Sequence, residues 1–272
     1  IDRHFFASVI GGIESVAHAA GYSVLVSQSN ERWEEEKNIV KTMLAKKIDG
    51  LAISLASETT DYKHFDAVIS RGVPVVFFDR VPLDKRSSCV RIDNRTAAYN
   101  AVMHLIKQGC TRIVHLSGPQ AISVYKDRQD GYVQALIDSD IRVDSSLIFE
   151  NSITLATGEK AGEKILEMPV LPDAIFSAGD YSAMGVMHVL KKNGVKVPED
   201  IAIVGFANEP FDSFVEPPLS SVDQVNKKMG EVLLEEMSVE PENRKWVDKV
   251  LDSSLIIRES SIKKDNLSKK DI

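Results

Sequence analysis

Residues 174–208, AIFSAGDYSAMGVMHVLKKNGVKVPEDIAIVGFAN, contain the pattern that decides the fold. The apolar run 174–178 has the length of a buried strand, and residues 180–193 carry apolar side chains at helical spacing before Gly194 ends the helix. A second apolar run, 201–206, follows. Two strands joined by a helix of this length lie parallel in one sheet, so the stretch predicts a β-α-β unit.

The same alternation of helices and strands extends in both directions from this unit. Helices are predicted over residues 5–20, 30–46, 60–71, 95–108, 123–138 and 158–168. Strands are predicted at 22–28, 48–54, 74–79, 89–93, 112–117 and 147–150. Strands separated by helices require parallel sheets with helices on both faces, so the fold class is α/β with two doubly wound lobes.

Composition limits the classes of function. The 272 residues are 43% hydrophobic and 27% charged, with a formal charge of −7, which suits a globular protein with a sizeable core. A negatively charged chain without a basic stripe does not bind the phosphate backbone of nucleic acid by itself. The lysines of the tail at 261–272 are predicted to be a solvated end.

Cysteine and histidine positions give no metal or redox site. Cys89 and Cys110 lack CxxC spacing, so two buried thiols in a reducing compartment are predicted, and the six histidines show no metal-ligand spacing. His115, inside an apolar run, is interpreted as a hydrogen-bonded core residue. No 18-residue apolar run is present, although a chain that begins at Ile1 leaves export open.

The sequence lacks the common catalytic and cofactor-binding motifs. The sequence has no GxGxxG after a strand, no GxxxxGK[ST], no HExxH and no GxSxG. The two glycines of IGGIES, residues 10–15, lie inside a helical pattern. We therefore expect neither an enzyme nor a bound cofactor or metal.

Polar residues and turn formers follow the predicted strands in both halves. They are Asp79, Asp93 with Asn94, Ser117 with Gly118, Gly179 with Asp180, and the stretch GFANEP at 205–210. Each could be a helix cap or a turn. Ligands of open parallel sheets bind beyond the carboxyl ends of the strands, so their joint occurrence favours a ligand site there.

Four ordered motifs resemble the effector-binding core of lactose-repressor-type (LacI/GalR) transcriptional regulators. They are HLIKQGCTRIVHLSGP (104–119), KDRQDGYVQAL (126–136), the stretch 172–210, and PPLSSVDQ (217–224). The resemblance implies the fold of periplasmic sugar-binding proteins, with the ligand in a cleft between two lobes joined by three crossovers. It places residues 1–93 and 225–249 in the N-terminal lobe, and 94–224 and 250–262 in the C-terminal lobe.

Two parts that the family normally has are missing from the sequence. One is the N-terminal helix-turn-helix DNA-binding domain, and the other is the first strand of the N-terminal lobe, which precedes the segment matching residues 3–14. A missing central strand leaves backbone groups of its neighbours unpaired. We therefore expect the folding unit to be longer than this sequence, or another segment to fill the gap.

The resemblance also implies ligand-binding residues. Phe5 and Phe6 match aromatic pocket residues, Asp79 a cleft carboxylate, and Arg128 a guanidinium that grips the ligand, its alternative being a surface ion pair with Asp127 or Asp130. The remaining matched positions are Ser123, Ile153, Ala207, Asn208 and Gln224.

At the stretch GFANEP the chain departs from sugar-responsive relatives. Many of them have Asp where this chain has Ala207, which cannot accept two hydroxyl hydrogen bonds. Asn208 is expected to compensate with both a donor and an acceptor, and Glu209 to turn to the lobe surface. A neutral or acidic sugar is the expected effector.

The resemblance implies a cytoplasmic allosteric regulator that binds operator DNA through the domain absent here. A homodimer is expected, with contacts from helices 5–20, 30–46 and 181–193 and from the segment Phe211–Val215. The alternative is a periplasmic sugar-binding protein that serves a transporter or sensor, which an upstream signal peptide would favour.

Overall fold

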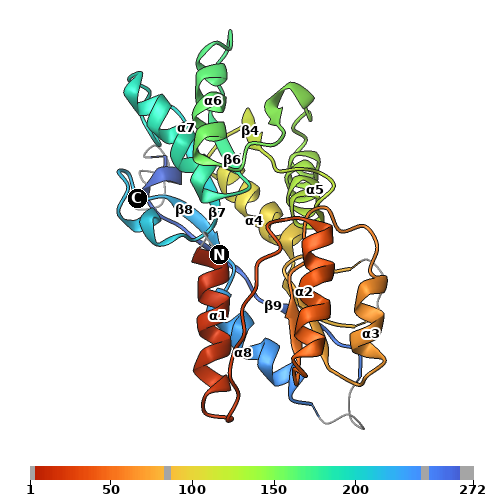
Figure 1. Cartoon of the computed structure of the whole chain (residues 1–272). Coiled ribbons are helices and arrows are strands. Elements are labelled where there is room, and N and C mark those ends of the chain that lie inside the picture. The colour runs from red at the N-terminus through yellow and green to blue at the C-terminus, as the bar shows by residue number, and fades with distance from the viewer. Residues whose placement is uncertain (1–3, 83–86, 240–244, 264–272) are drawn as a thin grey trace. The chain divides into compact units, whose positions relative to one another are not determined.

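The computed structural model describes residues 4–82, 87–239 and 245–263, which fall into two compact units (Figure 1). Unit 1 comprises residues 1–92 and 225–252, and unit 2 comprises residues 93–224 and 253–272. The resemblance predicts lobe boundaries after residues 93 and 249, and the structure divides the chain after residues 92 and 252.

Unit 1 is built on a parallel sheet of four strands in the order β1-β2-β3-β9. The strands are β1 (Leu51–Ile53), β2 (Val75–Phe78), β3 (Ser88–Ile92) and β9 (Asp248–Leu251). Its helices are α1 (His4–Ala17), α2 (Trp33–Ala45), α3 (Asp66–Ile69) and α8 (Asn226–Met237), with the 3-10 helix η1 (Lys63–Phe65) before α3.

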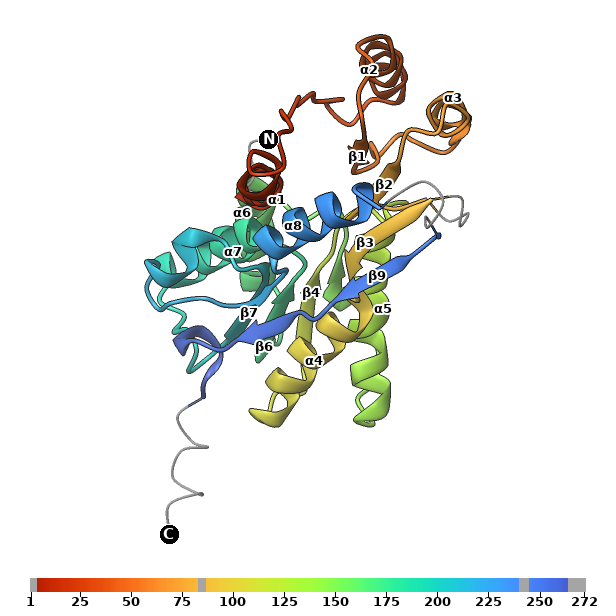
Figure 2. The ribbon, with the colours of Figure 1, turned by 90° about the horizontal axis from the view of Figure 1, so that it is seen from below.

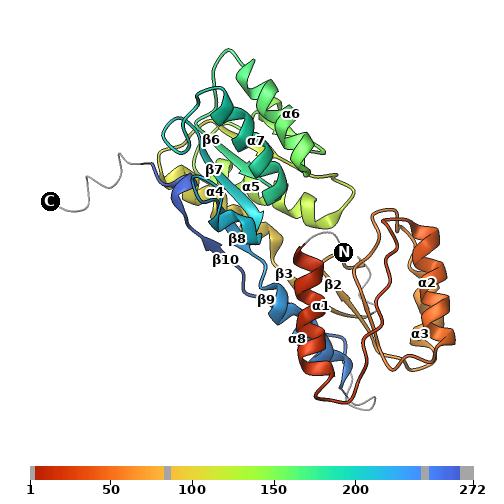
Figure 3. The same ribbon diagram turned by 60° about the vertical axis from the view of Figure 1, so that its left-hand side comes forward.

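Helices α1 and α8 of unit 1 pack side by side (Figure 3). A Cβ atom at Gly12 would overlap the backbone carbonyl of Lys227, and one at Gly230 would overlap the carbonyl of Val9. The glycines therefore allow the two backbones to approach directly. This contact explains why glycine occurs inside the helical pattern of IGGIES.

The prediction of a strand at residues 22–28 is wrong. Residues 22–28 are not in a strand, and Tyr22, Leu25 and Val26 are exposed. A strand needs a hydrogen-bonded neighbour, and among the described residues β1 pairs only with β2. No described segment fills the expected gap. The helix predicted at 60–71 is shorter, consisting only of η1 and α3.

Unit 2 contains a six-stranded sheet in the order β10-β8-β7-β6-β4-β5. The strands are β4 (Ile113–Leu116), β5 (Ile148–Phe149), β6 (Ala174–Ser177), β7 (Ala202–Ala207), β8 (Ser220–Asp223) and β10 (Ser254–Ile256). All pairs are parallel except β10 with β8, which is antiparallel. The α/β class and the β-α-β unit predicted from residues 174–208 are confirmed.

The helices of unit 2 cover both faces of this sheet (Figure 2). They are α4 (Asn94–Lys107), α5 (Ser123–Asp138), α6 (Leu155–Leu166) and α7 (Asp180–Lys192), together with the 3-10 helices η2 (Ser145–Leu147), η3 (Pro210–Ser213) and η5 (Glu259–Ser261). Helix α4 packs with α5, and α6 packs with α7.

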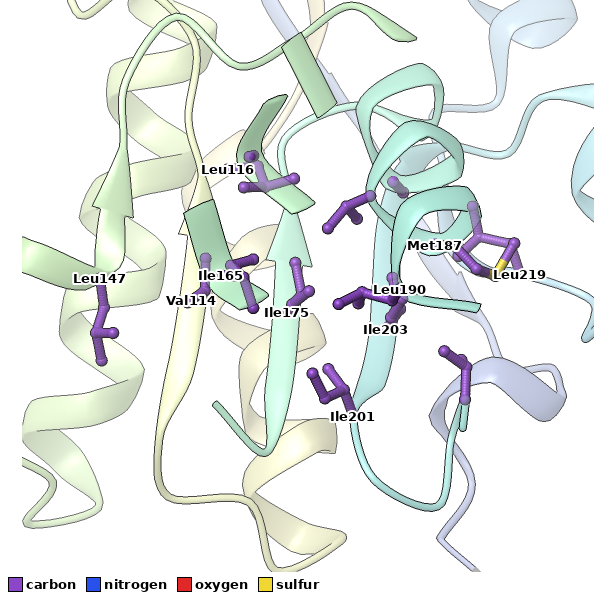
Figure 4. Packing of buried hydrophobic residues seen from close by; sticks show 14 residues of the cluster. Val114, Leu116, Leu147, Ile165, Ile175, Met187, Leu190, Ile201, Ile203 and Leu219 are labelled. Atoms are coloured by element: carbon purple, nitrogen blue, oxygen red, sulfur yellow. The ribbon is translucent and has the colours of Figure 1, made fainter. Parts of the chain in front are cut away.

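Apolar side chains from α6 and α7 meet the sheet in a buried cluster of 14 residues (Figure 4). Ile175 and Ile203 of the central strands and Leu190 of α7 are fully buried in it. Burial of each such side chain contributes about 1.5–3 kcal/mol. This core makes unit 2 a rigid support for the loops at its strand ends.

Candidate functional site

The carboxyl ends of the parallel strands of unit 2 lie along one edge of its sheet. Strand β4 is followed by Ser117 and β6 by Ala178, whereas β7 ends at Ala207 and β8 is followed by Gln224. Ligands of open α/β sheets bind at this edge. Helix α5 adds Arg128 to the same unit.

Arg128 is a buried cation held in a fixed orientation, with 5% of its surface exposed. Its Nε donates to Oδ1 of Asn94 and its Nη1 donates to the carbonyl of Ala178, both at 2.8 Å. The guanidinium carbon lies 3.7 Å from the ring centroid of Phe206, a cation-π distance. The side chain is therefore preorganised directly after β6.

Arg128 does not lie at the surface, as its alternative role in a surface ion pair would require. The side chain is 5% exposed, and one of the two proposed partners, Asp130, pairs with Lys126 at 2.6 Å. A buried guanidinium with rigid donors is suited to hold a ligand rich in oxygen acceptors.

His115 of β4 is a core residue, as its position in an apolar run predicted. Its ring stacks between those of Tyr132 and Phe176, and its Nδ1 lies 3.1 Å from the carbonyl oxygen of Phe176. Complete burial lowers the pKa of His115 to about 4. The imidazole is therefore neutral at physiological pH.

A small apolar cluster lies at the start of α5. Val124 and Tyr125 are buried with Ala178, and Ile153 packs against them, whereas Ser123 is half-buried at the first position of the helix. The predicted contacts Ser123 and Ile153 thus lie beside an apolar wall.

Ala207 and Asn208 form a strained turn at the end of β7, with φ values of +135° and +51°. The N–H of Asn208 donates to Oγ of Ser221 at 2.9 Å, and Nη2 of Arg258 donates to Oδ1 of Asn208 at 2.7 Å. Because Oδ1 already accepts from Arg258, the amide N–H groups are the main part of Asn208 that a ligand could use.

Glu209 does not turn to the surface, so that expectation is wrong. The residue is 4% exposed, and its N–H donates to Oδ2 of Asp180 at 3.1 Å. The bond ties the turn to the start of α7. Gln224, at the end of β8, is also buried, and the next residue, Val225, has a left-handed φ of +50°.

The three remaining predicted residues belong to unit 1. Phe5 is a buried core residue, whereas Phe6 is half-buried and its ring centroid lies 6.3 Å from that of Phe78, at the end of β2. Asp79 follows β2 with a φ of +56°, and its N–H donates to the carbonyl of Val90. Phe6 and Asp79 therefore flank the last residue of β2.

Within residues 4–82, 87–239 and 245–263, no group of three or more His, Cys, Asp or Glu side chains could hold a metal ion. No helix in those ranges is long and apolar enough to span a bilayer. Cys89 and Cys110 are free thiols, and burial raises the pKa of each to about 11.

Comparison with known proteins assigns the family. Residues 2–251 match the family model described as periplasmic binding proteins and sugar binding domain of LacI family. The chain belongs to the LacI family.

The relatives within the LacI family are regulators. The transcriptional repressor CytR of Escherichia coli K12 is 34% identical over 264 residues, which cover 94% of this chain and 75% of CytR. Catabolite control protein A of Priestia megaterium is 32% identical over 258 residues, with coverage of 94% and 75%.

Solved structures of LacI-type regulators have the same fold. The regulator CcpA of Lactococcus lactis superposes with a TM-score of 0.84 at 27% identity, covering 94% of each chain. A complex of the regulator CelR with cellobiose gives 0.83 at 28% identity, covering 95% of this chain and 79% of CelR.

The family fixes the general function of the chain. It is an effector-binding domain of a LacI-type transcriptional regulator, and its relatives are repressors rather than enzymes. The alternative of a periplasmic transport protein is not favoured, since these relatives are HTH-type repressors and a catabolite control protein.

Sequence reasoning missed two residues that shape the site. Arg258 reaches Asn208 from the segment after β10, and Ser221 of β8 accepts from the backbone of the same turn. No local pattern indicates either contact, because each joins segments that are distant in the sequence. The sequence identifies Asn94 only as a polar residue after a predicted strand.

Proposed function

We propose that the chain senses a small carbohydrate or carbohydrate derivative at the carboxyl edge of the unit 2 sheet. The observation that carries the proposal is the buried Arg128, held by Asn94 and Ala178 and backed by Phe206. Its rigid donors suit a ligand with several oxygen acceptors, and the neighbouring apolar wall suits the face of a sugar ring.

Two comparisons support the carbohydrate class. The family is described as having a sugar binding domain, and one similar structure is a complex of CelR with cellobiose. We propose Ser123, Arg128, Ile153, Ala207, Asn208 and Gln224 as the contacts that unit 2 makes with the effector.

The proposed action is allosteric control of transcription in the cytoplasm. An effector that binds one conformation of this domain more tightly shifts the population toward it. If that conformation also changes the affinity for operator DNA, the two binding events are coupled reciprocally. DNA contact is assigned to a part of the regulator other than this acidic chain.

A thermal-shift screen tests the effector class. Neutral sugars, sugar acids, sugar phosphates and free purine bases are compared at equal concentration, since a ligand that binds the folded state raises its apparent stability. A carbohydrate that raises the Tm, with the Kd then measured by calorimetry, supports the proposal. Stabilisation by free purine bases alone would contradict it.

We also propose that the chain forms a homodimer. Phe214, in the segment predicted as a contact surface, is 88% exposed, and the preceding Phe211 packs edge-on against Tyr181 of α7. A large exposed aromatic side chain is typical of an interaction surface.

Sedimentation equilibrium tests the dimer. We expect a dimer at micromolar concentration that Phe214→Ser weakens, while Val170→Ser, at another strongly exposed apolar residue of the same unit, leaves the dimer unchanged. Equal association of both variants would exclude Phe214 from the interface, and a monomeric wild type would contradict the proposal.

A further inference from the structure

Two carboxyl groups of unit 2 are buried in contact with each other. Asp180, the first residue of α7, is 1% exposed, and Asp212, in the 3-10 helix η3, is completely buried. The two carboxyl groups interact with one another. A carboxyl group buried beside another can be hydrogen-bonded to it only if one of the two carries a proton.

The donors around the pair are distributed unequally. Oδ1 of Asp180 accepts from Oγ of Ser221 at 2.7 Å, and its Oδ2 accepts from the N–H of Glu209. Within the described residues, neither oxygen of Asp212 accepts from an N–H or hydroxyl group. Asp180 is therefore the better carboxylate and Asp212 the better acid.

The nearby charges do not allow both groups to ionise. Arg258 favours a charge on Asp212, whereas Asp180 and Glu209 oppose it. Burial, followed by the charge of Asp180, raises the pKa of Asp212 to about 9. Burial also raises the pKa of Asp180, against the hydrogen bonds from Ser221 and Glu209.

We propose that Asp180 and Asp212 share one proton at neutral pH, and that this acid pair holds the strained turn Ala207–Glu209 in place. The contacts are continuous. Asp180 accepts from the N–H of Glu209 and from Ser221, and Oγ of Ser221 in turn accepts from the N–H of Asn208.

The positive φ values of Ala207 and Asn208 show why the turn needs such support. Residues with a side chain are strained in this region and persist only where surrounding contacts hold them. Loss of the shared proton would place two buried negative charges together and loosen the turn. Any effect of the loosened turn on effector binding rests on the proposed function. The shared proton and its link to the turn do not.

The pH dependence of stability tests the shared proton without any effector. A carboxyl pKa raised in the folded state means that the fold keeps a proton which the unfolded chain releases. The stabilisation is therefore complete below about pH 4 and is lost as pH rises to about 9. Each pH unit in this window changes the unfolding equilibrium by up to tenfold.

Asp212→Asn is the informative variant, because its amide can donate to Asp180 without titrating. We expect the wild-type Tm to fall from pH 5 to pH 9 relative to that of Asp212→Asn. The control Asp140→Asn changes an exposed aspartate of the same unit and should follow the wild type. Identical pH profiles of Asp212→Asn and wild type would overturn the proposal.

Infrared spectroscopy with carbon-13-labelled aspartate gives a second measurement that does not depend on stability. We expect a protonated carboxyl band at pH 7 in the wild type that Asp212→Asn removes and Asp140→Asn retains. Absence of this band from the wild type would exclude the shared proton, even if Asp212→Asn were unstable.

The Ala207 methyl group tests the link to the turn. In protein labelled at alanine methyl groups, its NMR signal should titrate near pH 9 in the wild type and stay constant in Asp212→Asn. A constant signal in both would show that the pair does not hold the turn. Failure of the carbohydrate screen would contradict the proposed function but leave these three results unaffected.

Discussion

Arg128 shows how a single residue acquires a role from its surroundings. Its two acceptors, Asn94 and Ala178, are 34 and 50 residues away in the sequence, so only the folded sheet brings them to the guanidinium. The side chain is held in place before any ligand arrives, which reduces the entropy that binding would cost.

Arg128→Ala should weaken binding of the effector found in the screen by about 1.5–3 kcal/mol, the usual contribution of a hydrogen bond to a charged group. Calorimetry measures the change. Arg95→Ala, at an exposed arginine of α4, should leave the Kd unaltered. Unchanged affinity in folded Arg128→Ala would remove Arg128 from the site.

His115 should make the protein sensitive to acid. Its pKa is about 4 in the folded state, below the ordinary value of 6.5, so between these values the unfolded chain binds a proton that the fold does not. The contribution of His115 to stability should therefore fall by up to about 1.4 kcal/mol per unit as pH drops from 6.5 to 4.

The variant His115→Phe keeps a stacking ring and removes this titration. In urea unfolding, the stability of wild type should fall relative to that of His115→Phe as pH drops from 6.5 to 4, whatever their absolute stabilities. The control His188→Gln, at an exposed histidine of α7, should keep the wild-type slope. Equal slopes for His115→Phe and wild type would contradict the assignment.

Among the elements, the helix pairs are joined through glycine in both units. Gly12 and Gly230 allow α1 and α8 to touch, and Gly158 and Gly185 do the same for α6 and α7. In each case a Cβ atom would overlap a backbone carbonyl of the opposite helix, which cannot move aside as a side chain can.

Gly12→Ala and Gly11→Ala form a matched pair within α1. A Cβ at Gly11 meets nothing within 4 Å, so Gly11→Ala should stabilise the helix by up to about 1 kcal/mol. Gly12→Ala should destabilise the protein, because α8 must move. Chemical denaturation distinguishes them, and equal effects of the two substitutions would contradict the close contact.

Most elements could be predicted because their signals are local. Helix α5 occupies the predicted residues 123–138, and β7 agrees closely with the apolar run 201–206. Residues 22–28 have equally strong β character, yet a strand also needs a neighbour, which periodicity cannot supply. The sequence around Asp212 does not predict its contact with Asp180, because that contact depends on how η3 packs.

At the scale of the whole molecule, the two units differ in the size of their cores. Among the described residues, unit 2 has more buried apolar side chains than unit 1, and β1 has only one buried residue. Local stability follows the amount of buried apolar surface, so unit 1 should open more readily than unit 2.

Hydrogen-exchange mass spectrometry should find slower exchange in β4, β6 and β7 of unit 2 than in β1 and β2 of unit 1. The comparison uses backbone amides that are hydrogen-bonded in both sheets, so burial of the surrounding core is the main difference. Equal protection would mean that the chain unfolds as one cooperative body.

The position of β9 affects how the chain matures on the ribosome. Arg91 and Asp248, which pair across β3 and β9, are separated by 157 residues, and nearly all of unit 2 lies between them. At ordinary translation rates that interval takes roughly 8–30 s. Until β9 has been synthesised, β3 remains an unpaired edge of the sheet. The nascent chain therefore exposes a site for mispairing that β9 covers in the complete protein.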